Sequence, residues 1–244
     1  MSAAPLLKVE GLRKTFKGLV AVDAVSFEVD EGSITAMIGP NGAGKTTTFN
    51  MIAGAMAPDS GEIALAGQSL AGLRADQVCH AGIGRTFQIV RPFPKLSVLD
   101  NVLIGGLRDG SSVATALRAA RETLDLLGLG KSEDQPAGTL TLPERKRLEV
   151  ARALACKPRL LLLDEVMAGL RPNETDELVA TFRALNKDRG VTILLIEHVM
   201  RAVMALSDVV YVLNYGKMIA HGTPGEVVAD PAVLECYLGE DTEI

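Results

Sequence analysis

A glycine-rich octapeptide in the first quarter of the chain has the residue types needed to hold a triphosphate. Residues 39–46 fit the pattern G-x-x-x-x-G-K-[ST] and follow the apolar run 34–38, which reads as a buried strand. Glycines let backbone N–H groups converge on phosphate oxygens, and the next helix offers its positive N-terminal end. Lys45 supplies a mobile charge for the phosphates, and Thr46 has a hydroxyl that can bind Mg²⁺. The pattern predicts nucleoside triphosphate binding, which a chance glycine-rich turn explains less well.

A second group of polar residues follows an apolar strand in the other half of the chain. Residues 160–163 are four leucines, and Asp164 and Glu165 come directly after them. Parallel α/β sheets place their ligand-binding residues at the carboxyl ends of strands. Asp164 can hold Mg²⁺ or its waters there, and Glu165 can accept a proton from an attacking water. Carboxylates also end strands as solvated caps, but the phosphate loop upstream favours the catalytic interpretation.

The elements that position these residues begin with short strands and tight turns. Residues 7–12, 25–29 and 33–38 have the pattern of an antiparallel sheet. After the phosphate loop, residues 47–53 predict a helix and residues 62–65 another short strand.

The remaining two thirds of the chain combine a helical insertion with further strands. The pattern is helical from about residue 96 to residue 155. The runs 160–163 and 191–196 are continuously apolar, which is typical of parallel strands covered on both faces. Residues 209–213 and 217–220 predict two further strands, and a capping box at residues 223–226 predicts a first terminal helix. These patterns indicate an α/β fold.

Composition narrows the possible functions. The chain has 244 residues, near the upper limit for one hydrophobic core, and a net charge of −5 that offers no basic field for nucleic acid or anionic lipid. Its three cysteines are odd in number and far apart, as expected for reduced thiols in a cytosolic protein. No apolar run approaches the roughly 20 residues that span a bilayer. A membrane role would therefore need a partner.

The order of these motifs resembles the ATP-binding subunits of ABC transporters over essentially the whole chain. Residues 39–47 match the Walker A motif of that family, and residues 160–165 match Walker B. Gln88 stands at the position of the Q-loop glutamine, His198 at that of the switch histidine, and Phe16 at that of the aromatic residue that stacks on adenine. The resemblance implies one ABC ATP-binding domain over residues 1–244. It would have a RecA-like parallel-sheet core, an N-terminal antiparallel β subdomain, a helical subdomain at about residues 96–155 and C-terminal helices in residues 222–244.

The same resemblance implies roles for individual residues, ATP as substrate and Mg²⁺ as cofactor. Catalytic roles fall to Glu165, His198, Gln88 and Lys45, and metal contacts to Thr46, Gln88 and Asp164. The implied nucleotide contacts are Phe16, Asn41, Gly42, Ala43, Gly44, Lys45, Thr46 and Thr47.

The implied roles agree with the chemistry of the side chains. The Gln88 amide can contact Mg²⁺ or water and sense the γ-phosphate, and His198 can donate to that phosphate and orient the water. Two simpler interpretations stay open, namely that His198 is a satisfied structural residue and that Phe16 packs in the core.

One segment departs from the family pattern. Residues 140–144 read Leu-Thr-Leu-Pro-Glu where the family signature is Leu-Ser-Gly-Gly-Gln, which caps the ATP of the other subunit in a head-to-tail dimer. Leu142 and Pro143 replace both glycines, and proline has no N–H to give. Glu144 also brings negative charge toward the triphosphate unless the basic residues 145–147 compensate for it. Those three residues have a simpler interpretation as a solvated helix face.

Three further segments resemble the subunits that energise branched-chain amino-acid importers. They are residues 85–93, residues 168–172, where only Arg171 departs from Ala-Gly-Leu-Asn-Pro, and the ending 221–240. The resemblance implies an ATPase that drives uptake of branched-chain amino acids or related small solutes. It would sit in the cytoplasm, on the inner face of the cell membrane, bound to permease subunits. A second ATPase subunit, identical or different, would complete the dimer, and a solute-binding protein would act indirectly.

Three other functions share the same motifs. The chain could energise lipid or lipopolysaccharide export, or it could be a non-transport ABC protein of DNA repair or translation. The non-transport class usually has long coiled coils or two cassettes in one chain, and this sequence has neither. A catalytically weak regulatory subunit is suggested by residues 141–144, although intact Lys45, Asp164, Glu165 and His198 argue against it.

Overall fold

The computed structural model describes residues 4–87, 92–107 and 112–238, and their strands form two sheets. The smaller sheet has the order β2-β1-β4-β5, and its pairs are antiparallel. The strands are β1 (Leu7–Phe16), β2 (Leu19–Val29), β4 (Ser60–Leu65) and β5 (Gln68–Ser69). The antiparallel N-terminal part is therefore confirmed, with β1 and β2 longer than the sequence predicted.

The larger sheet has the order β10-β9-β3-β8-β7-β6 and is parallel except for β10. Its strands are β3 (Ile34–Ile38), β6 (Ile83–Arg85), β7 (Leu160–Asp164), β8 (Thr192–Ile196), β9 (Val209–Asn214) and β10 (Lys217–Gly222). The predicted parallel core is confirmed. The three-residue strand β6, which pairs with β7, was not predicted.

The assignment of residues 33–38 to the antiparallel sheet was wrong. The strand β3 lies between β8 and β9 and runs parallel to both. All five of its residues are buried, because this central strand is covered on both faces. The tight turn at residues 31–32 therefore carries the chain from one sheet to the other.

Two apolar clusters cover the two faces of the larger sheet. One cluster contains Leu161 and Leu163 together with Phe182, and the other contains Leu160 and Leu162. Alternate leucines of β7 thus enter opposite clusters, as the two-residue period of a strand requires. Helices pack on the first face, whereas the antiparallel sheet and the helix after the phosphate loop pack on the second.

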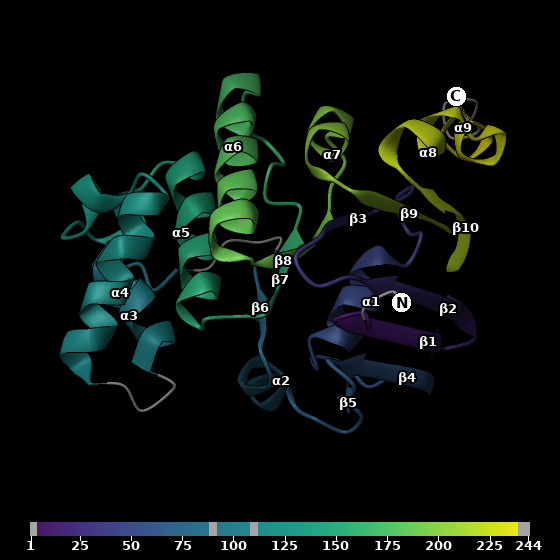
Figure 1. The fold of residues 1–244 in the computed structure, drawn as a ribbon, viewed down its shortest axis with the longest axis horizontal. Helices are drawn as coiled ribbons and strands as arrows, with labels where there is room; N and C mark the ends of the chain where they lie inside the picture. The colour runs from purple at the N-terminus through teal and green to yellow at the C-terminus, as the bar shows by residue number, and fades with distance from the viewer. Residues whose placement is uncertain (1–3, 88–91, 108–111, 239–244) are drawn as a thin grey trace.

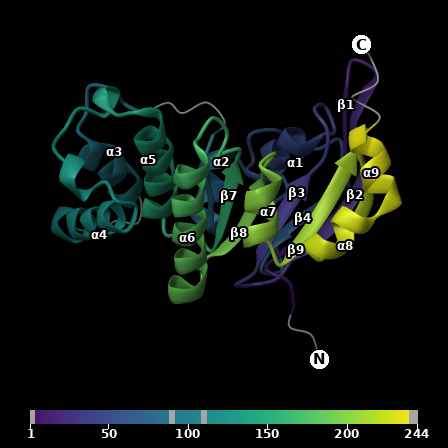
Figure 2. The same ribbon diagram turned by 90° about the horizontal axis from the view of Figure 1, so that it is seen from above.

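The helices separate into two regions (Figure 1). Beside the sheets are α1 (Lys45–Ile52), α2 (Ala75–Ala81), α6 (Pro172–Arg189), α7 (Met200–Leu206), α8 (Pro224–Ala229) and α9 (Pro231–Leu238). At one end of the molecule lie α3 (Val98–Gly106), α4 (Val113–Leu126) and α5 (Leu142–Ala155), with the 3₁₀ turns Gly130–Ser132 and Ala137–Thr139. Figure 2 shows the same group at the end opposite to α8 and α9.

These positions agree with a helical insertion and two terminal helices, although the subdomain limits at about residues 96–155 and 222–244 stay a prediction. In the described residues, no helix combines the length and the apolar character needed to cross a bilayer.

Candidate nucleotide site

The phosphate loop, which connects β3 to α1, forms one wall of a cavity. The cavity has a volume of about 300 Å³ and is lined by Ala21, Asn41, Gly42, Ala43, Gly44, Lys45, Thr46, Thr47 and Glu165. The fold thus brings Glu165, from the end of β7, to the seven loop residues that the sequence predicted as nucleotide contacts. Ala21 was not predicted as a site residue. It is an alanine within β2, and neither its residue type nor its neighbours in the sequence indicate a nucleotide site.

Two glycines of the loop are required by close backbone contacts. A Cβ on Gly39, whose φ is +143°, would lie 2.0 Å from the carbonyl oxygen of Leu213. A Cβ on Gly44, at φ +101°, would lie 2.4 Å from the carbonyl oxygen of Ala21. Gly42 also has a positive φ, but a Cβ there meets nothing within 4 Å. The loop is therefore fixed by neighbouring strands at both of its ends.

Lys45 is held inside this loop. Its Nζ donates to the carbonyl oxygens of Gly39 and Pro40 at 2.6 and 2.7 Å, and the side chain is buried. The carbonyls offset part of the cost of burying an ammonium group. The Lys45 ammonium group thus lies inside the loop. A bound phosphate would compete with the two carbonyl oxygens for hydrogen bonds from this group.

Glu165 and His198 meet at the carboxyl ends of two adjacent strands. Strands β7 and β8 pair in parallel with Asp164 opposite Ile196, so the residues that follow them lie side by side. His198 Nε2 is 2.5 Å from Glu165 Oε1. The Glu165 N–H donates to the Ile196 carbonyl at 2.9 Å, and its φ of +51° lies in the left-handed region. This strained backbone is held by the sheet and turns the carboxylate toward the phosphate loop.

Two residues that the sequence did not single out fix the loop after β7. Lys146 on α5 is buried, and its Nζ donates to the Glu165 carbonyl at 3.0 Å. Glu197 is 1% exposed, and its Oε1 accepts from the Met167 N–H at 2.9 Å. The loop is thus bound on one side by the helical region and on the other by β8.

The solvated-face interpretation of residues 145–147 is therefore wrong for Lys146, because α5 packs against the end of β7. Arg147 makes an ion pair with Glu177 on the exposed face of α6. The only sequence signal for Lys146 was the basic run itself, which does not say which of its members faces inward.

Burial dominates the electrostatics of Glu197. It raises the pKa of this carboxyl to about 7, since the Met167 N–H and Lys146 only partly offset the cost of burying the charge, and Glu165 adds to it. The second oxygen, Oε2, is buried and meets no hydrogen-bond partner in the part of the chain that the structure describes. Burial also lowers the pKa of Lys146, and the nearby charge of Glu197 opposes this. A proton on Glu197 would relieve the unfavourable burial of its charge.

Asp164 is available to a metal on one oxygen only. Its Oδ2 accepts from Arg85 Nη2 at 2.9 Å, whereas the buried Oδ1 has no hydrogen-bond partner among the described residues. Burial raises the pKa of Asp164, and the hydrogen bond from Arg85 opposes that rise. Thr46 is exposed to the nucleotide cavity. An unpartnered carboxylate oxygen and a free-facing hydroxyl fit Mg²⁺, which binds few protein oxygens together with phosphates and water.

The described residues contain no group of three or more His, Cys, Asp or Glu side chains arranged to hold a metal. The phosphates of a bound nucleotide would therefore have to supply much of the coordination.

Of the predicted site residues that the structure describes, Asp164, His198 and Phe16 do not line the cavity, although Asp164 precedes Glu165 and His198 contacts it. Gln88 lies outside the described residues. Phe16 ends β1, does not line the cavity and is 40% exposed, with Lys14 Nζ 5.9 Å from the ring centroid. Core packing is therefore wrong for Phe16, and its stacking on adenine stays a prediction.

The altered signature segment forms the start of α5. The N–H and the hydroxyl of Thr141 both donate to Glu144 Oε2, at 2.8 and 2.7 Å, and Pro143 occupies the first turn of the helix, where its missing N–H costs nothing. The hydrogen bonds from Thr141 lower the pKa of the Glu144 carboxyl. The Glu144 charge is thus engaged at the helix start, and the hydroxyl that replaces the family serine is already a donor to it.

Comparisons with known proteins agree with this geometry. A family model described as ABC transporter matches residues 22–168, and one described as branched-chain amino acid ATP-binding cassette transporter matches residues 217–243. The chain is 40% identical to the high-affinity branched-chain amino acid transport ATP-binding protein BraF of Pseudomonas aeruginosa and 42% identical to LivG of Salmonella typhimurium. Each match covers 97% of this chain and 98% of the relative. The lipopolysaccharide export system ATP-binding protein LptB of Escherichia coli is 36% identical over 96% of this chain and 98% of its own.

Solved structures of similar fold include ABC cassettes in two states. A nucleotide-free ATP-binding cassette has a TM-score of 0.88 and 31% identity, covering 96% of this chain and 99% of its own. A cassette in its ADP conformation has a TM-score of 0.88 and 32% identity, covering 97% and 100%.

The glycine contacts predict unequal effects of two alanine substitutions. Gly39→Ala should lower the free energy of unfolding by about 2 kcal/mol or more, because its Cβ would overlap the Leu213 carbonyl as well as straining φ. Gly42→Ala, the control, should cost roughly 1 kcal/mol from φ alone. Urea denaturation of both variants measures the difference, and equal losses would contradict the close contact at Gly39.

The buried Glu197 carboxyl predicts a pH-dependent stability. Because its folded pKa of about 7 lies above the ordinary glutamate value of 4.5, its protonated form stabilises the fold below pH 4.5, and this stability is lost as the pH rises through 7. Glu197→Gln removes the titration, so its free energy of unfolding relative to wild type should rise by on the order of 2–3 kcal/mol between pH 5 and pH 8.

Urea denaturation at several pH values tests this expectation, with Glu165, Lys146 and His198 as the charged or titratable neighbours left unchanged. The control is Glu177→Gln, because Glu177 is 61% exposed on its side chain and its variant should differ from wild type by a constant amount. A constant difference for Glu197→Gln as well would show that burial does not control this carboxyl.

Proposed function

Since this chain belongs to the ABC transporter family, we propose that it is the ATP-binding and ATP-hydrolysing subunit of an importer for branched-chain amino acids or related small solutes. The observation that carries the proposal is the Glu165–His198 pair beside the cavity of the phosphate loop. The names of BraF and LivG, at 40% and 42% identity, support the solute class. The match of residues 217–243 to the branched-chain amino acid model supports import over the export function named for LptB.

ATP binding begins with an exchange of partners at Lys45. Its ammonium group leaves the carbonyl oxygens of Gly39 and Pro40 for the β- and γ-phosphates, while the N–H groups of residues 41–46 surround the phosphate oxygens. The adenine ring stacks on Phe16, which is 40% exposed.

Hydrolysis depends on Glu165 as general base. Its carboxylate takes a proton from the water that attacks the γ-phosphorus, and the bond to the leaving β-phosphate oxygen breaks. His198 Nε2, now 2.5 Å from Glu165 Oε1, turns to donate a hydrogen bond to the γ-phosphate. The contact between the two side chains supports these roles, because a base and a phosphate sensor must both reach the attacking water.

The residues that would hold Mg²⁺ are Thr46 through its hydroxyl, Asp164 through Oδ1, and Gln88 through its side-chain amide. When bound, the ion neutralises charge on the β- and γ-phosphates.

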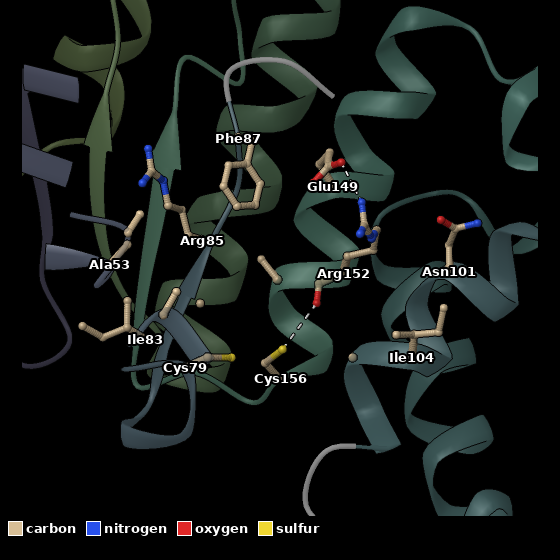
Figure 3. Close-up of a pocket in the computed structure, with 15 residues that line it drawn as sticks. Ala53, Cys79, Ile83, Arg85, Phe87, Asn101, Ile104, Glu149, Arg152 and Cys156 are labelled. Atoms are coloured by element: carbon tan, nitrogen blue, oxygen red, sulfur yellow. Dashed lines mark hydrogen bonds and ion pairs between the residues drawn. The ribbon is translucent and has the colours of Figure 1, made fainter. Parts of the chain in front are cut away.

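A groove lined by α2, β6, α3 and α5 is the surface to which a permease binds in this proposal (Figure 3). It has a volume of about 260 Å³ and lies between α2 and β6 on one side and α3 and α5 on the other. Its lining is mostly apolar, and Phe87, which immediately precedes Gln88, is 56% exposed in it. A cytoplasmic helix of the permease docks here and holds the chain peripherally on the inner face of the membrane.

The chain works as one of two ATPase subunits, identical or different, that close on two ATP molecules and pull the helical regions inward. A solute-binding protein on the other side of the membrane delivers the solute and acts on this chain only through the permease. Nucleic acid is not a partner.

Isolation of the chain from gently solubilised membranes of its native host tests the proposal as a whole. Mass spectrometry should find two hydrophobic permeases and an ATPase subunit travelling with it. Recovery of ribosomes or DNA-repair proteins, without a permease, would contradict a transport function.

Glu165→Gln should keep ATP binding within a few-fold of wild type but lower the ATPase rate by about 10²–10⁴-fold, since the amide cannot accept the proton. Nucleotide binding and phosphate release are measured on the same preparation. Glu62→Gln, an exposed carboxyl on β4, is the control and should keep the wild-type rate. An unchanged rate in Glu165→Gln would remove Glu165 from the role of base.

Phe87→Ala should lower the amount of permease recovered with the chain by about tenfold or more, because buried aromatic residues contribute strongly to interfaces. Leu19→Ala removes an apolar side chain that is more exposed, at 71%, but lies on β2, outside the groove, and should leave the recovery unchanged. Equal recovery for the two variants would place the permease on another surface.

A further inference from the structure

Arg85 lies at a junction of three parts of the molecule that the proposed function uses. It ends β6, the edge strand of the larger sheet, and is paired with Leu162 of β7, two residues before Asp164. Its side chain is 9% exposed. In the sequence, Arg85 stands out only as the first residue of the segment 85–93, and nothing local to it predicts a chemical role.

The guanidinium group of Arg85 makes two directed hydrogen bonds at once. Nη2 donates to Asp164 Oδ2 at 2.9 Å, and Nη1 donates to Asn50 Oδ1 at 2.7 Å. Asn50 belongs to α1, the helix that follows the phosphate loop. The planar group therefore ties the end of β7 to the phosphate-binding helix, with a geometry that the single point charge of a lysine cannot reproduce.

The same bond settles which oxygen of Asp164 is left for a ligand. Oδ2 is engaged by Arg85, while Oδ1 is buried and has no hydrogen-bond partner in the described structure. A carboxylate with one oxygen fixed by a neighbouring donor and the other unpartnered is oriented for metal binding, and such orienting partners commonly control metal affinity.

Arg85 also borders the groove in which the proposed function places the permease. Its Cζ is 5.4 Å from the centroid of the Phe87 ring, and both residues line the groove. Figure 3 shows the Phe87 ring between Arg85 on one side and Glu149 and Arg152 on the other.

We propose that Arg85 is a positioning residue that orients Asp164 for the nucleotide-bound metal ion. The inference rests on the proposed ATPase function, because it assumes that Asp164 meets Mg²⁺ together with ATP. Arg85 itself touches neither nucleotide nor metal in this proposal. It acts through Asp164 Oδ2 and through its anchor on Asn50.

The test measures binding of a fluorescent ATP analogue to the full chain in EDTA and over a titration with MgCl₂. Arg85→Lys keeps the positive charge but loses the planar guanidinium group with its two directed hydrogen bonds. The affinity for the ATP analogue in EDTA should therefore stay within about twofold of wild type. The Mg²⁺ concentration that gives half of the metal-dependent gain in affinity should rise roughly tenfold or more, as is typical when a residue orienting a metal ligand is changed. Arg152→Lys, a charge-conserving change of the other groove arginine, is the matched control and should keep the wild-type Mg²⁺ requirement.

A second background separates positioning from a general effect on folding. In Asp164→Asn the carboxylate is gone, so adding Arg85→Lys should raise the Mg²⁺ requirement no further. Asn50→Ala, which removes the anchor without changing charge, should raise the Mg²⁺ requirement less than Arg85→Lys does. Thermal melting of every variant identifies any that fail to fold.

Three results would overturn the inference. They are a wild-type Mg²⁺ requirement in Arg85→Lys, an equal loss of affinity with and without Mg²⁺, and a full additional effect of Arg85→Lys in the Asp164→Asn background. Failure of the wild-type chain to bind the analogue in any condition would instead contradict the proposed function, so the two failures are distinguishable.

Discussion

The burial of negative charge at the end of β7 is the constraint on which the arrangement of the site depends. Four leucines buried on both faces of the sheet lead directly into Asp164 and Glu165, so the two acids are withdrawn from water by the strand that carries them. Buried charges must be paired or hydrogen-bonded. The surrounding elements meet this requirement in part. Arg85 from β6 donates to Asp164 Oδ2, and His198 after β8 lies against Glu165 Oε1. Lys146 from α5 holds the Glu165 backbone carbonyl, and among the described residues Asp164 Oδ1 has no hydrogen-bond partner.

The phosphate loop carries positive charge, so it requires an anion where the end of β7 requires cations or hydrogen-bond donors. Lys45 is a buried cation that is held by backbone carbonyls, and the N–H groups beside it require an anion. Because the cavity is bordered by this loop and by Glu165, it combines a positive wall with a negative one. In the proposed function a triphosphate would bind the loop, and a water molecule on its far side would meet the Glu165 carboxylate. The order of charges across the cavity therefore matches hydrolysis at the terminal phosphate.

The sequence predicted those parts of the site that depend on local pattern. A glycine-rich turn between an apolar strand and a helix, and carboxylates after four leucines, can be read without knowing what lies beside them. The contributions of Arg85, Lys146 and Glu197 could not be read in this way, because each depends on a neighbour far away in the chain. Lys146 lies in a basic run whose inward-facing member is decided by the packing of α5 on β7. Arg85 ends a strand of three residues, too short to show a period. The sheet to which β3 belongs was misjudged for the same reason, since strand partners are set by non-local contacts.

The altered segment at the start of α5 lies on the same helix end as Lys146, which holds the Glu165 carbonyl. The helix begins with the Thr141–Glu144 capping box, and Lys146 follows within the next turn, where it holds the Glu165 carbonyl. The residues that would face the ATP of a second subunit and the residue that holds the catalytic loop of the same chain therefore share one short, rigid stretch of helix. A displacement of this helix end beyond the reach of the Lys146 side chain would carry Glu165 with it or break the hydrogen bond. The position of Glu165 is thus linked to the helical region, and in the proposed function closure of two subunits would act on Glu165 through α5.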